Sequence, residues 1–136
     1  GTFVTSRRLG RTFDSSQGFE LPSGDTVEPD HSFVSTERWT AAPTPVEGEF
    51  LRVTPDWVGE VLSTRTASRD RGEKKAIYER IGVREYWLID PRSRQITVHV
   101  SKDGRFDGGK THAEEERICS GVFAELELTV RELMPE

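Results

Sequence analysis

The sequence of 136 residues has a single cysteine, Cys119, and no long hydrophobic run. One cysteine excludes an intrachain disulfide and a metal site built from cysteines, and it suits a reducing cytoplasm. No apolar stretch approaches the roughly 18 residues of a membrane-spanning helix, so we expect no membrane partner. Apolar residues make up only 33% of the chain, which predicts one domain with a modest core.

The chain also lacks an overall positive charge, since its formal net charge is −5. This balance counts against non-specific binding of nucleic acid over the whole surface. Basic side chains are nevertheless concentrated in one short segment, which contains Arg65, Arg69, Arg71, Lys74, Lys75 and Arg80. If the chain acts on nucleic acid, we expect Arg65, Arg69 and Arg71 to contact its phosphates.

Residue patterns predict a mixed central sheet with a flanking helix, an α/β fold of the α+β kind. Residues 56–62 are apolar apart from Glu60, which is typical of a buried central strand. A helix is predicted over residues 70–81, because apolar side chains recur on one stripe and Gly82 follows. A strand over residues 85–90 comes next, so this unit implies a right-handed crossover between parallel strands.

Shorter elements surround this unit. We predict strands on either side of a turn at residues 21–25 and a further strand over residues 29–34. A loop is predicted at residues 41–48, and a tight turn leads from the strand at 85–90 into another at 95–100. Residues 130–134 are predicted to form a helical turn.

Three charged residues fall where the pattern predicts burial, namely Asp30, Glu60 and Lys74. Burying an isolated charge costs several kcal/mol unless the charge is paired or binds a metal. If the strand that starts at Asp30 pairs antiparallel with residues 56–62, Asp30 and Glu60 become neighbours. Lys74, on the inward stripe of the following helix, can then lean toward the same strand end.

Asp56 is a secondary candidate for this site. It precedes Glu60 by four residues, or roughly 13 Å along a strand at about 3.3 Å per residue. Only a shift in strand register would bring it to the others.

Two carboxylates beside a lysine have a clear chemical use. Carboxylate oxygens suit Mg²⁺ or Mn²⁺, and such an ion makes water more acidic and offsets charge on a phosphoryl oxygen. We therefore expect Asp30 and Glu60 to hold the metal, with Lys74 orienting the water or stabilising the transition state.

The order Pro29-Asp30, Glu60-Val61-Leu62 and Lys74 resembles the pattern of PD-(D/E)XK nucleases. The chain is more closely similar to the Uma-type family of restriction-endonuclease-like proteins. That similarity lies in the runs PDWVGEVLS at 55–63, DRGEK at 70–74 and EYWLIDP at 85–91. The resemblance implies a restriction-endonuclease-like fold and a Mg²⁺-dependent nuclease, with DNA as the expected substrate and a homodimer as one possible assembly.

The chain departs from this pattern in two respects. Leu62 stands where a lysine is expected two residues after the glutamate, so Lys74 would be the relocated lysine. An upstream helical segment with an acidic residue has no counterpart, so we expect residues 1–136 to be a single domain that lacks an N-terminal segment.

Two alternatives stay open beside the endonuclease. The domain could be a catalytically idle scaffold that binds nucleic acid or a protein partner, which the acidic net charge favours. It could also be a metal hydrolase that acts on small phosphodiesters, since no motif identifies the substrate.

Overall fold

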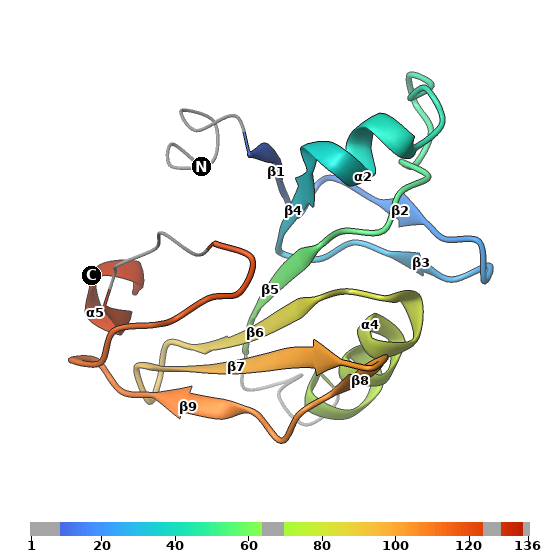
Figure 1. The fold of residues 1–136 in the computed structure, drawn as a ribbon. Coiled ribbons are helices and arrows are strands. Elements are labelled where there is room, and N and C mark those ends of the chain that lie inside the picture. The colour runs from blue at the N-terminus through green and yellow to red at the C-terminus, as the bar shows by residue number, and fades with distance from the viewer. Residues whose placement is uncertain (1–8, 64–69, 124–128, 135–136) are drawn as a thin grey trace.

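The fold is built around strand β5 (Trp57–Val61), the central strand of a mixed sheet. The computed structural model describes residues 9–63, 70–123 and 129–134. Within these residues, seven strands form the main sheet in the order β1-β4-β5-β6-β7-β8, and β9 pairs with β7 (Figure 1). Strands β5 and β6 run parallel, whereas every other described pairing in this sheet is antiparallel.

The remaining elements complete this sheet in chain order. The other strands are β1 (Gly10–Asp14), β2 (Phe19–Glu20), β3 (Thr26–Val27), β4 (His31–Ser35), β6 (Glu85–Asp90), β7 (Gln95–Lys102), β8 (Arg105–Phe106) and β9 (Lys110–His112). The helices are α2 (Thr36–Ala41), the π-helical turn η1 (Asp70–Lys74), α4 (Lys75–Ile81) and α5 (Val130–Leu133). Strands β2 and β3 form a separate two-stranded sheet. None of the helices in the described ranges has the length and hydrophobicity of a membrane span.

The sheet buries a different core on each face. Alternate residues of a strand point to opposite faces, so Tyr86 and Leu88 of β6 share one face and Trp87 points to the other. Tyr86 and Leu88 pack in the cluster that includes Tyr78 of α4. Trp87 packs in a second cluster with Val130 of α5. Helix α4 and the C-terminal segment therefore cover opposite sides of the sheet.

Several predicted elements are confirmed. The strand expected at 56–62 is β5, and it pairs in parallel with β6 after a helical crossover. Gly82 ends α4 with a φ of 92°, a left-handed conformation that glycine adopts without steric cost. The predicted C-terminal helical turn is α5.

Two local structures differ from the prediction. Residues 36–41 form helix α2, which the sequence analysis did not predict. The side chain of Ser35 caps this helix by accepting from the backbone N–H of Arg38 at 3.2 Å. The helix predicted over 70–81 is also not uniform, because its first five residues form the π-helical turn η1. Such turns contain one more residue than an α-helical turn and often lie at functional sites.

Candidate active site

Glu60 lies near the end of β5, and its side chain is 1% exposed. The residue points toward the face that α4 covers, as its neighbour Leu88 does on the adjacent strand. A carboxylate in such a place needs partners for both oxygens, since an unpaired buried charge is costly. The helix after β5 provides these partners.

Lys74 and Tyr78 bind the two oxygens of the Glu60 carboxylate. The Lys74 ammonium lies 3.4 Å from Oε2, and the Tyr78 hydroxyl donates a short hydrogen bond to Oε1. The two residues are four positions apart, so they extend from consecutive turns of η1 and α4 toward the same point. Tyr78 is 2% exposed, whereas the Lys74 side chain is 42% exposed. Lys74 therefore reaches both the buried carboxylate and the solvent.

Asp30 lies immediately before β4 and next to Glu60. The register of β4 on β5 pairs His31 with Gly59, which puts Asp30 opposite Glu60. The ladder of backbone bonds ends here, and the Asp30 carboxylate continues it by accepting from the Val61 N–H at 2.8 Å. The antiparallel pairing thus brings together Asp30 and Glu60, as the sequence analysis predicted.

The two neighbouring carboxylates change the ionisation of Glu60. Burial is the largest cause, and it raises the pKa of Glu60 to about 7; the charge of Asp30 acts in the same direction. The hydrogen bond from Tyr78 and the charge of Lys74 lower this pKa but do not offset the burial. The ionised form of Glu60 therefore lacks sufficient positive charge around it.

This donor set fits a divalent cation. Mg²⁺ is commonly held by one or two protein carboxylates, with water and substrate oxygens as its other ligands. Asp30 and Glu60 supply two carboxylates on adjacent strands, and a cation beside them would offset their repulsion. Across the ranges that the structure describes, no group of three or more His, Cys, Asp or Glu side chains is arranged to hold a metal. These two carboxylates are thus the candidate protein ligands.

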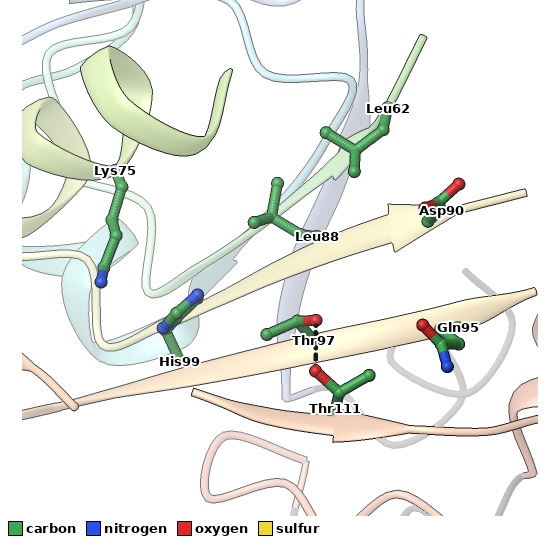
Figure 2. Close-up of a pocket in the computed structure, with 8 residues that line it drawn as sticks. All are labelled: Leu62, Lys75, Leu88, Asp90, Gln95, Thr97, His99 and Thr111. Atoms are coloured by element: carbon green, nitrogen blue, oxygen red, sulfur yellow. Dashed lines mark hydrogen bonds between the residues drawn. The ribbon is translucent and has the colours of Figure 1, made fainter. Parts of the chain in front are cut away.

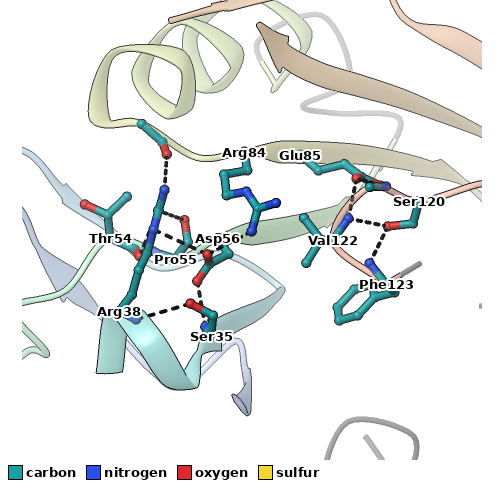
Figure 3. Close-up of polar contacts among 12 residues, drawn as sticks. Ser35, Arg38, Thr54, Pro55, Asp56, Arg84, Glu85, Ser120, Val122 and Phe123 are labelled. Carbon is teal, nitrogen blue, oxygen red and sulfur yellow. Dashed lines mark hydrogen bonds and ion pairs between the residues drawn. The ribbon is translucent and has the colours of Figure 1, made fainter. Parts of the chain in front are cut away.

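Asp56 is not brought to this site. It precedes the other end of β5, where its carboxylate accepts from the Ser35 N–H at 2.6 Å (Figure 3). Arg38 and Arg84 pair with the same carboxylate at 3.3 and 3.5 Å. The structure therefore gives Asp56 a local role in joining β4, α2 and the start of β6, and the alternative register that would have moved it is not adopted.

The predicted phosphate contacts fall largely outside the described residues. Arg65 and Arg69 lie in the segment 64–69, which the structure does not describe. The backbone of Arg71 belongs to η1, but its side chain is not described. These three arginines remain predicted contacts.

Sequence analysis did not assign a role to the Tyr78 hydroxyl, because Tyr78 was treated as part of the apolar stripe of the helix. The spacing of four residues from Lys74 was the available signal, since residues at this spacing lie on one helical face. Only the packing of α4 against β5 shows that this hydroxyl reaches Glu60.

The comparison with protein families is decisive for classification. Residues 1–131 match the model of the Uma2 family, described as "Putative restriction endonuclease". The chain belongs to the Uma2 family. The resemblance noted in the sequence is thereby confirmed. A search of curated proteins finds no match.

A solved structure supports the fold of this Uma2 member. It is described as a "putative nuclease belonging to DUF820 from Anabaena variabilis" and superimposes with a TM-score of 0.77. The two chains are 22% identical, and the match covers 97% of this chain and 72% of the other. The α+β fold with its mixed sheet is therefore restriction-endonuclease-like. Nucleases with this fold generally use divalent metals.

Proposed function

We propose that this Uma2 chain is a metal-dependent endonuclease that hydrolyses phosphodiester bonds in DNA, with Asp30, Glu60 and Lys74 as its catalytic residues. One observation carries the proposal. Two carboxylates on adjacent strands lie together, and a lysine that also reaches solvent is paired with one of them. Family membership supports the nuclease class.

Each side chain has a distinct task in this proposal. Asp30 and Glu60 hold a Mg²⁺ or Mn²⁺ ion, and the hydrogen bond from Tyr78 fixes the orientation of Glu60. The ion supplies Lewis acidity, which offsets charge on the phosphoryl group and makes water more acidic. The Lys74 ammonium orients the attacking water and stabilises the negative charge that develops on the phosphate.

The raised pKa of Glu60 gives this site a pH dependence. A proton on Glu60 competes with the cation, since metal ligands act in their deprotonated form. Because burial raises the pKa of Glu60 to about 7, metal affinity increases as the pH rises through neutrality. One proton is released from Glu60 when the ion binds below that pH.

Cleavage of DNA in the presence of Mg²⁺ or Mn²⁺ tests the proposal. We expect Glu60→Gln and Lys74→Met to lower the cleavage rate at least about a hundredfold, while circular dichroism shows a retained fold. Glu47→Gln is the matched control, because Glu47 is an exposed loop residue and its change removes the same charge. Parental rates in both Glu60→Gln and Lys74→Met would refute the assignment.

A scaffold without turnover is the second candidate. It is favoured by the net charge of −5 and by a described metal site limited to two carboxylates. Calorimetric titration with Mn²⁺ separates the two functions. Binding that Glu60→Gln abolishes supports the enzyme, whereas DNA binding without metal binding or cleavage supports the scaffold.

A further inference from the structure

A polar pocket lies on the sheet face that carries Glu60. The registers of β5, β6, β7 and β9 join Glu60 to Leu88, Leu88 to Thr97 and Thr97 to Thr111. Residues that are paired across a sheet point to the same face, so these four side chains form one row. Thr97 is two strands from Glu60, or about 10 Å at the usual strand spacing. The row thus leads from the candidate active site into the pocket.

The pocket encloses about 370 Å³, which is within the range of about 300–1,000 Å³ typical of small-ligand sites. Leu62 and Leu88 form its apolar part, and both side chains are under 9% exposed. Thr97 and Thr111 lie along its opposite side and share a hydrogen bond of 2.9 Å (Figure 2). An apolar surface with a few fixed polar groups is the usual construction of a ligand site.

The two ends of the pocket differ in charge. Lys75, the first residue of α4, lies at one end beside His99, and Asp90 lies at the other end beside Gln95 (Figure 2). Burial lowers the pKa of His99, so Lys75 supplies the positive charge at neutral pH. Asp90 accepts from the Arg92 N–H at 3.0 Å, which holds its carboxylate in place. A ligand that spans the pocket meets a cation at one end and hydrogen-bond acceptors at the other.

We propose that this pocket binds one unstacked nucleobase of the strand being cut, next to the phosphate held at Asp30, Glu60 and Lys74. The inference rests on the proposed nuclease function and deepens it, because it names the substrate as a strand that is unpaired at the cut. Leu62 and Leu88 contact the base face, while Gln95 and Thr97 bind its polar edge. Lys75 contacts a neighbouring phosphate.

The chemistry of the pocket favours a base over other parts of a nucleic acid. A phosphate alone would leave the apolar surface of Leu62 and Leu88 unused and would meet the negative charge of Asp90. A base has a flat apolar face and an edge of donors and acceptors, which match the leucines and the amide and hydroxyl groups. In an intact duplex each base is stacked and paired, so it enters a side pocket only after leaving the helix.

The test uses Glu60→Gln protein, so that binding is measured without turnover. Fluorescence anisotropy at one fixed low salt concentration compares a labelled single-stranded DNA with a strand of the same length made of abasic nucleotides. We expect the abasic strand to bind about three- to tenfold more weakly, because each hydrogen bond contributes a factor of this order. A duplex of the same sequence should also bind more weakly than the single strand.

Pocket variants then assign the difference to these residues. Adding Gln95→Ala and Thr97→Val should lower the affinity for the normal strand to the abasic level and leave abasic binding unchanged. Thr26→Val is the matched control, because Thr26 is an exposed strand residue of the separate sheet. Circular dichroism checks that each variant is folded.

Three outcomes would overturn the pocket assignment. These are equal binding of normal and abasic strands, equal weakening of both by the pocket variants, and absence of binding to any strand. Cleavage that depends on Glu60 tests the nuclease function separately. The two proposals can therefore fail independently.

Discussion

The two ends of strand β5 each place a buried carboxylate in the same sheet, and their surroundings differ. Asp56 and Glu60 are each 1% exposed. Asp56 accepts from a backbone N–H and pairs with two arginines. Glu60 has one tyrosine and one lysine, and a second carboxylate stands beside it. The first carboxylate is compensated by the protein, whereas the second is left with a need for further positive charge.

This difference separates a structural carboxylate from a candidate catalytic one. The partners of Asp56 come from β4, α2 and the residue before β6, so its charge joins elements that are far apart in the sequence (Figure 3). Burial raises the pKa of Glu60 to about 7, which costs stability when this residue is ionised. Perturbed ionisable groups of this kind cluster at functional sites.

The largest effect on stability is expected at the compensated end. Asp56→Asn removes the charge that pairs with Arg38 and Arg84 and weakens the bond from the Ser35 N–H. We expect the free energy of unfolding to fall by about 3 kcal/mol, measured by urea denaturation at neutral pH. A loss below about 1 kcal/mol would show that the two ends of β5 do not differ in this way.

The opposite sign is expected for Glu60→Gln without metal. In the parent protein, the pKa of Glu60 rises from 4.5 to about 7 on folding, so the unfolded state ionises first as the pH increases. Stability of the parent therefore falls between about pH 4.5 and 7 and stays lowered above that range. Glutamine avoids this cost and should raise the free energy of unfolding by about 2 kcal/mol at alkaline pH.

Urea denaturation with a chelator present, at an acidic and an alkaline pH, measures this effect. Near pH 4 the two proteins should differ little, because Glu60 is then protonated in both the folded and unfolded states. Destabilisation by Glu60→Gln at alkaline pH would contradict the idea that the ionised carboxylate is undercompensated.

A smaller effect is expected for Tyr78→Phe. The hydrogen bond from Tyr78 lowers the pKa of Glu60, so its loss should raise that pKa further, by about one unit or about 1.4 kcal/mol. The midpoint of the pH dependence of Mn²⁺ affinity, measured by calorimetry, should move to higher pH by a similar amount. An unchanged midpoint would mean that Tyr78 does not set the ionisation of Glu60.

Sequence reasoning was most successful around β5 and β6. Glu60 interrupts an apolar run, and Gly82 ends the following helix, so the strand–helix–strand unit was recognisable from residue pattern alone. Helix α2 was missed because it has six residues and buries none of them, which leaves no apolar stripe to detect. The π-helical turn was missed because no residue pattern distinguishes it from an α-helical turn.

The sequence by itself determined the family, the parallel pair of strands and the presence of three charged residues in apolar surroundings. Tertiary structure decided which of these charges are compensated. Asp56 and Glu60 are four residues apart in one strand, and local pattern does not show that arginines reach the first while a tyrosine, a lysine and an aspartate reach the second. Compensation depends on side chains from distant segments, and only the folding of the chain brings those segments together.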